Sequence, residues 1–127
     1  MITKRPGRNG GVLVTFVMSA SIWADTIYVV GDFNQWDEQA TPLRLTDNGW
    51  MATLELDAGR AYQYRYLLNR VEWHNDWNAD GYEPNRFGGD NSVVMTPDFT
   101  EQAQTTMTDS ERLLTFVRPQ LRLISTG

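Results

Sequence analysis

The segment 62–68 alternates between large hydrophobic and polar side chains, and this pattern constrains the fold more than any other part of the chain. Its three tyrosines fall on one side of an extended backbone, whereas Gln63 and Arg65 fall on the other. A period of two residues is typical of a strand with one buried face. The segment therefore predicts a β-strand that lies between a hydrophobic core and the surface.

Comparable short segments, separated by turn signals, recur along most of the chain. Asp47-Asn48-Gly49 is one such signal, because Asn and Gly tolerate the positive φ of tight turns. The strands expected besides 62–68 are 12–18, 26–31, 42–45, 50–56, 71–74 and 92–95. No helical pattern interrupts them. Short strands at this spacing predict an all-β fold, an immunoglobulin-like antiparallel β-sandwich over residues 11–96.

The N-terminal part of the chain allows two interpretations. Residues 1–10 are polar and rich in Gly, and we expect them to be disordered. Basic residues, the apolar run 12–18 and small residues after it also resemble a cleaved secretory signal. The alternation within 12–18 favours a first strand, since its removal would take away a strand that the sandwich needs.

Residues 97–127 form a C-terminal extension of different character. Thr108 and Glu111 match a helix-capping box and predict a short helix over 109–117, which Pro119 would end. The segment 108–124 is apolar enough to fold back on the domain, to dock on a partner protein or to form a homodimer.

The overall charge and composition exclude several classes of function. The 127 residues carry a net charge of −5, which argues against nucleic acid as a partner. The chain has no Cys, so it has neither disulfides nor thiolate metal sites. No stretch approaches the roughly 20 apolar residues of a membrane span. We expect no cofactor, no metal and no membrane contact.

Two tryptophans stand in polar surroundings where a core residue would be unusual. Trp36 lies in a polar loop, and Trp73 follows a turn. A sugar ring has an apolar face of C–H groups that can lie on an indole, while Gln63, Arg65 and Asn91 are suitable partners for its hydroxyl groups. The alternative from these residues alone is that both rings fill the core of the sandwich.

The run Gly31-Asp32-Phe33-Asn34-Gln35-Trp36 resembles the signature of carbohydrate-binding module family 48. This family includes the glycogen-binding domain of the AMP-activated kinase beta subunit and the N-terminal domains of branching and debranching enzymes. The resemblance continues in order through 62–66, 71–76 and 87–94 and covers about residues 11–96. It implies a sandwich that binds α-1,4-linked glucan without cutting it, in the cytoplasm.

The resemblance also implies a role for individual residues. Trp36 and Trp73 correspond to the two stacking tryptophans, and Arg65 takes the place of a basic residue, often Lys, that bonds sugar hydroxyls. Asn91 corresponds to an Asn that makes a polar contact, and Phe87 takes the place of a Leu in the same loop. The carbohydrate-binding residues expected are thus Trp36, Arg65, Trp73, Asn91, Gln63 and Phe87. Gly89 stands where the kinase subunits have Thr, which removes a hydroxyl group.

Catalytic and metal sites have weaker support in the sequence. Asp76 and Asp80 could be read as a glycosidase pair, but a small sandwich offers no deep cleft to raise one pKa. The run 76–81 resembles half of a calcium loop, yet Phe87 stands where a bidentate Glu is required. We expect no catalytic residue. The competing function is that of a scaffold or regulatory protein, which would dock a kinase, a glucan-processing enzyme or a second copy through the C-terminal segment.

Overall fold

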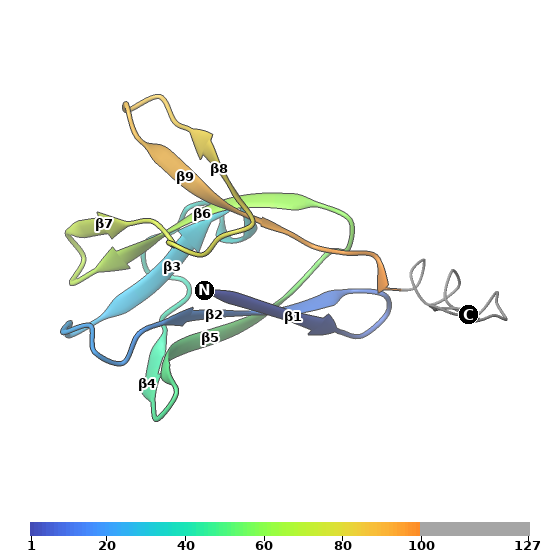
Figure 1. The fold of residues 1–127 in the computed structure, drawn as a ribbon, viewed down its shortest axis with the longest axis horizontal. Helices are drawn as coiled ribbons and strands as arrows, with labels where there is room; N and C mark the ends of the chain where they lie inside the picture. Colours follow the sequence, from blue (N-terminus) through green and yellow to red (C-terminus); the bar gives the residue numbers. More distant parts are fainter. Residues whose placement is uncertain (100–127) are drawn as a thin grey trace, which may run out of the picture. The chain divides into compact units, whose positions relative to one another are not determined.

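The computed structural model describes residues 1–99, in which nine strands form two antiparallel sheets (Figure 1). The first sheet has the order β1-β2-β5-β4, with β1 Ile2–Pro6, β2 Val12–Met18, β5 Gly49–Leu56 and β4 Arg44–Thr46. The second has the order β3-β6-β9-β8, with β3 Ile27–Gly31, β6 Ala61–Leu68, β9 Asp90–Met95 and β8 Gly81–Pro84. The short strand β7, Glu72–His74, pairs with β6. A 3₁₀ turn, η1, covers Asp32–Asn34.

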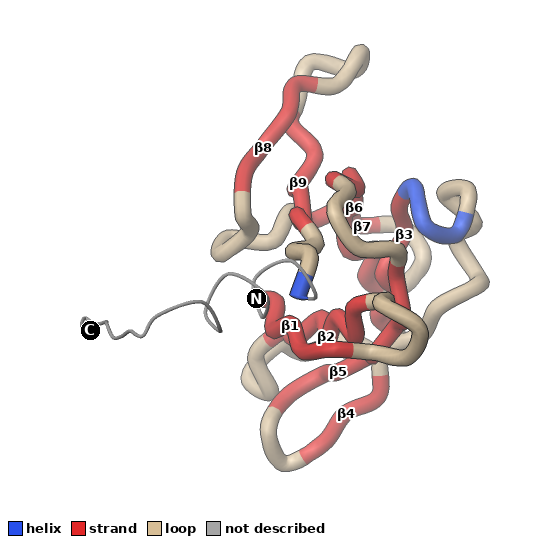
Figure 2. The backbone as a smooth tube through the Cα atoms, turned by 90° about the vertical axis from the view of Figure 1, so that its right-hand side faces the viewer, coloured by secondary structure: helices blue, strands red, loops and turns tan. Residues whose placement is uncertain are grey.

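The two sheets lie as separate layers, and Figure 2 shows them from the side. Phe16 of β2 and Tyr64 of β6 meet between the layers in an edge-to-face contact, with ring centroids 5.0 Å apart. Tyr66 lies against Tyr64 at 5.8 Å, and all three rings are fully buried. The inward-facing aromatic side of β6 is therefore the centre of the core, and the predicted all-β sandwich is confirmed.

The N-terminal residues correct one prediction. We expected residues 1–10 to be disordered, but Ile2–Pro6 form β1 and pair with β2 from Ile2↔Phe16 to Pro6↔Val12. The Lys4 ammonium also donates to Asp80 at 2.6 Å. These partners lie far away in the sequence, so local composition did not reveal them. Because β1 pairs with one side of β2 and β5 pairs with the other, β2 is an interior strand of its sheet.

The second unexpected strand, β8, lies in the segment 75–90 that we predicted to be a loop. Gly81 and Pro84 bound this strand, and both residues are typical of turns. Its pairing with β9 makes it a strand despite this composition. The hairpin β8–β9 is part of the second sheet and carries the loop 85–89 at its tip (Figure 1).

The seven strands predicted from the sequence are all present, with boundaries shifted by up to two residues. The predicted helix 109–117 and the predicted docking segment 108–124 lie outside the described residues. Within residues 1–99, no helix is long and apolar enough to cross a membrane.

Gly31 ends β3 at a place where no side chain fits. A Cβ built there would collide with the carbonyl oxygen of Gln63 and would lie 2.7 Å from the Cβ of Tyr64. The chain can therefore turn into η1 directly against β6 only with glycine at this position. This close approach sets the start of the loop that carries Trp36.

Replacement of Gly31 by Ala should destabilise the sandwich by about 1–3 kcal/mol, because backbone atoms must move to admit the methyl group. Gly81→Ala is the matched control, since a Cβ there meets only the Met95 side chain at 3.9 Å. We expect the control to stay within about 0.5 kcal/mol of the parent. Urea unfolding followed by circular dichroism measures both variants, and equal stabilities for the two would contradict this packing argument.

Candidate functional site

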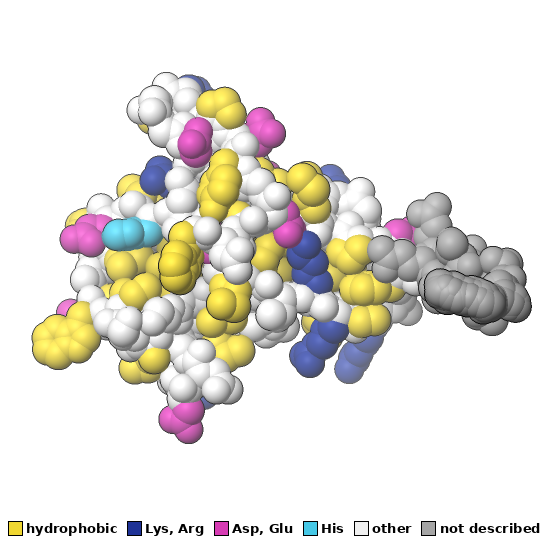
Figure 3. All heavy atoms as spheres, in the orientation of Figure 1, with side chains coloured by type: hydrophobic (Ala, Val, Ile, Leu, Met, Phe, Trp, Pro, Cys, Tyr) yellow, Lys and Arg dark blue, Asp and Glu magenta, His cyan; other side chains and the backbone are white. Residues whose placement is uncertain are grey.

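Exposed aromatic rings alone do not single out a site on this protein. On the face shown in Figure 3, hydrophobic side chains form separate patches among polar and charged groups. In one hollow of about 600 Å³, three aromatic, three amide and three charged side chains converge. It is lined by residues of four segments: Asp32, Trp36, Gln63, Arg65, Trp73, Asn85, Arg86, Phe87 and Asn91.

Trp36 reaches the hollow from the loop that follows η1. Gln35 and Trp36 both have left-handed backbones, with φ of 56° and 57°, which is uncommon for residues other than glycine. The Trp36 amide donates to the Gly31 carbonyl at 2.9 Å, and its indole N–H donates to Asp32 at 2.9 Å. These bonds hold a half-buried ring in a sterically unfavourable conformation. The loop therefore presents this ring at the surface and keeps it out of the core.

The outward face of β6 forms the floor of the hollow. Because residues alternate along a strand, the inward tyrosines leave Gln63 and Arg65 pointing away from the core. The pairing Leu67↔Trp73 places the indole of β7 on the same face, and Trp73 is 37% exposed. The Arg65 guanidinium lies over the Trp73 ring, 5.9 Å from its centroid. This contact fixes the indole and the charge relative to each other.

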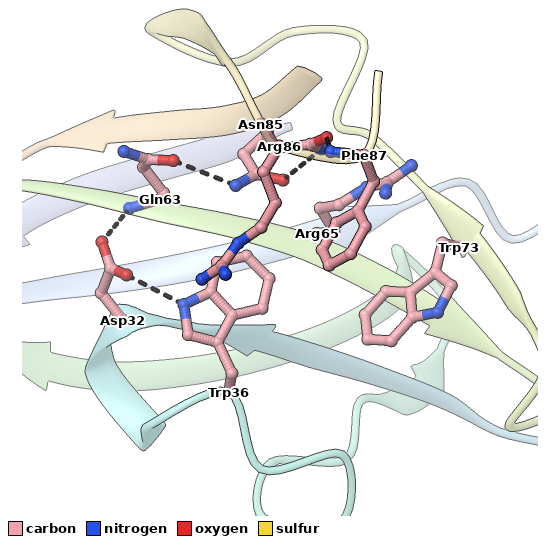
Figure 4. Close-up of a pocket in the computed structure, with 9 residues that line it drawn as sticks. Asp32, Trp36, Gln63, Arg65, Trp73, Asn85, Arg86 and Phe87 are labelled. Atoms are coloured by element: carbon pink, nitrogen blue, oxygen red, sulfur yellow. Dashed lines mark hydrogen bonds between the residues drawn. The ribbon is translucent and has the colours of Figure 1, made fainter. Parts of the chain in front are cut away.

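The hairpin tip at 85–89 forms the third wall. The Asn85 side-chain oxygen accepts from the amides of Phe87 at 2.9 Å and Gly89 at 3.2 Å, which closes the loop. Figure 4 shows Phe87 reaching in from this loop, while Trp36 and Trp73 stand apart on the opposite side. Phe87 is 88% exposed. A ring this exposed gains little from the protein itself and is available to a ligand.

The arrangement suits a ligand with flat apolar faces and polar edges. Trp36 and Trp73 supply two aromatic surfaces, and Gln63 and Asn91 line the same hollow with amide side chains. Asn91 donates to Gln63 at 3.0 Å, so the two amides are already ordered. Pyranose rings have both kinds of surface. The hollow lies on the outward face of the second sheet.

The chain matches the family model described as carbohydrate-binding module 48 (isoamylase N-terminal domain) over residues 16–83, more than half of its length. The chain belongs to this family. Modules of this kind are non-catalytic binding domains, so carbohydrate is a partner of this one. The match includes Trp36, Gln63, Arg65 and Trp73 and ends before the hairpin tip at 85–89.

All six side chains that the sequence singled out line this one hollow of the module: Trp36, Gln63, Arg65, Trp73, Phe87 and Asn91. Sequence reasoning missed three further lining residues, Asp32, Asn85 and Arg86. The signal for Asp32 was its position four residues before Trp36, within reach of the indole across a tight turn. Asn85 and Arg86 gave no comparable signal, because their placement depends on the β8–β9 pairing.

Asp76 lies apart from the hollow and has a structural role. Its carboxylate is buried and accepts from the hydroxyls of Tyr64 at 2.8 Å and Tyr66 at 3.0 Å, and it also contacts the amino group of Met1. Asp80 instead bonds Lys4 and the Met95 amide. The two carboxylates considered in the sequence as a catalytic pair or as calcium ligands are thus engaged by the protein. Within residues 1–99, no three His, Asp or Glu side chains gather as metal ligands.

Burial, reinforced by the neighbouring charge of Asp76, raises the pKa of the Tyr66 hydroxyl well above its usual value, and the same causes raise the pKa of Tyr64. In the unfolded chain a tyrosine titrates near pH 10. Above that pH the unfolded state loses these protons while the folded state keeps them. The stability that they provide is therefore complete below about pH 10 and is lost as the pH rises beyond it.

We expect the free energy of unfolding to fall by up to about 1.4 kcal/mol per pH unit for each of these tyrosines above pH 10. Tyr66→Phe should flatten the slope by one such contribution and cost about 1–2 kcal/mol at neutral pH through the lost hydrogen bond to the carboxylate. Urea unfolding between about pH 9 and 11 measures both effects. A Tyr66→Phe slope equal to that of the parent protein would rule out this explanation.

Proposed function

We propose that this module binds α-1,4-linked glucan, such as glycogen, starch or maltooligosaccharide, without cutting it. The observation that carries the proposal is the convergence of Trp36 and Trp73 on one hollow with Arg65, Gln63 and Asn91. The two indoles stack on glucose rings of one chain. The guanidinium and amide groups bond the hydroxyls, and Phe87 covers the ligand from the hairpin side.

The proposal includes weak binding and a cytoplasmic location beside storage polysaccharide. Sugar hydroxyls exchange water for protein groups at little net gain in free energy. Most of the affinity must then come from the stacked rings. We expect a Kd of roughly 10 μM to 1 mM for maltoheptaose. A polymer offers many such segments to each module, which favours retention on glycogen despite a weak single contact.

Trp36→Ala and Trp73→Ala should each weaken glycogen binding by about tenfold or more, because each removes a stacking surface worth about 1.4 kcal/mol or more. The matched control is Trp77→Ala, since Trp77 is 84% exposed and does not line the hollow. Co-sedimentation with glycogen gives the bound fraction. Thermal unfolding verifies that each variant is folded.

The outcome of this experiment depends on the comparison among the three tryptophans. Unchanged binding by Trp77→Ala, together with the two losses, supports the hollow as the glucan site. Equal binding by all three variants and the parent protein would show that the exposed rings of the hollow do not contact the polysaccharide.

A further inference from the structure

The amide side chains of the hollow form a series of hydrogen bonds with one donor-to-acceptor direction, which is set at the hairpin tip. The Asn85 oxygen accepts from the backbone amides of Phe87 and Gly89, at 2.9 Å and 3.2 Å. Backbone N–H groups can only donate, so the orientation of the Asn85 amide is determined. Its oxygen faces the loop, and its NH₂ group must donate elsewhere.

The same donor-to-acceptor direction continues through two more side-chain amides, so that three amides form a relay. Asn85 donates to the Asn91 oxygen at 3.2 Å, and Asn91 donates to the Gln63 oxygen at 3.0 Å. Every amide oxygen of this relay is engaged by a protein donor (Figure 4). The Gln63 NH₂ group at its end has no protein partner within residues 1–99. The relay therefore offers the hollow a free donor at its Gln63 end, while each of its oxygens already accepts at least one protein hydrogen bond.

The one carboxylate of the hollow is engaged in the same way. One Asp32 oxygen accepts from the Trp36 indole at 2.9 Å, and the other accepts from the Gln63 backbone amide at 2.7 Å. Both oxygens therefore help to position the loop and β6, and each keeps only part of its acceptor capacity for a ligand.

Two guanidinium groups supply further donors. Arg65 and Arg86 lie over the rings of Trp73 and Phe87, each 5.9 Å from the centroid. In the part of the chain that the structure describes, neither arginine side chain has an ion pair or a hydrogen bond, and the buried Nε of Arg65 is without a partner. Two cations and one carboxylate line the hollow, although the whole chain carries a net charge of −5.

This excess of positive charge and of hydrogen-bond donors fits an anionic ligand better than a neutral one. A neutral sugar hydroxyl can accept a hydrogen bond from a guanidinium but leaves its positive charge unpaired. A phosphate monoester carries about −1.5 to −2 charges and three acceptor oxygens, and it matches the fork of a guanidinium. We propose that the hollow recognises α-glucan that carries a phosphate monoester on a glucose unit, with Arg65 and Arg86 as the phosphate contacts. This inference rests on the proposed function and names its substrate class.

The test compares two ligands on the full 127-residue chain. One is maltoheptaose, and the other is maltoheptaose with a single phosphate monoester at O6 of one glucose unit. Calorimetric titration at low salt should give about tenfold tighter binding for the phosphorylated ligand. At about 0.5 M salt the ratio of the two affinities should fall several-fold, because ions screen the charge. Inorganic phosphate alone should compete only weakly.

The variants assign the preference to the hollow. Arg86→Gln should reduce the ratio of the two affinities from about tenfold to about threefold or less. Arg44→Gln is the matched control, because it removes the same charge from an exposed position on β4 in the other sheet. It should leave the ratio unchanged. An equal fall in both variants would mean that overall charge causes the preference, and it would overturn the assignment.

The remaining outcomes separate the two proposals. Equal affinity of the parent protein for both ligands overturns the phosphate preference and leaves glucan binding intact. Binding of neither ligand overturns both. Strong competition by inorganic phosphate alone would show a site for the free anion, and that result would also contradict recognition of a phosphorylated glucan.

Discussion

The two faces of β6 determine both the fold and the site of this protein. On one face, Tyr64 and Tyr66 fill the space between the sheets and donate to the buried Asp76 carboxylate. Because side chains alternate along a strand, the same backbone directs Gln63 and Arg65 to the surface. A shift of one residue in the pairing of β6 would bury the polar residues and expose the tyrosines. Core packing therefore also sets the positions of the two side chains that line the hollow.

The other parts of the site are attached to β6 through its neighbours. β3 pairs along β6 and delivers the Trp36 loop by way of Gly31, whose missing side chain permits close contact with Gln63 and Tyr64. β7 and β9 share the opposite edge, where they pair with different parts of β6, and Trp73 comes from β7. The aromatic rings of the hollow thus come from separate loops and strands, and each of these segments is held to β6 by a paired strand. Such preorganisation lowers the entropic cost of binding a flexible sugar chain.

The sequence was sufficient for features that depend on local pattern. Period-two alternation predicted β6. The family resemblance singled out side chains that line one hollow, such as Trp36 and Asn91. The sequence was insufficient where a segment depends on a distant partner. Ile2–Pro6 becomes a strand only through β2, and Gly81–Pro84 only through β9. Arg86 and Asn85 were missed for the same reason, since the hairpin that holds them was not foreseen.

We propose that one glucan chain lies across the outward face of β6 and touches Trp36 and Trp73 together. The most direct measurement is a titration of ¹⁵N-labelled protein with maltoheptaose, followed through the indole N–H signals of its five tryptophans. Assignment requires only one Trp→Phe variant for each ring. The account predicts that the signals of Trp36 and Trp73 shift along one common binding curve, while those of Trp23 and Trp77 stay in place. Shifts confined to Trp23 or Trp77, or no indole shift at saturating sugar, would contradict it.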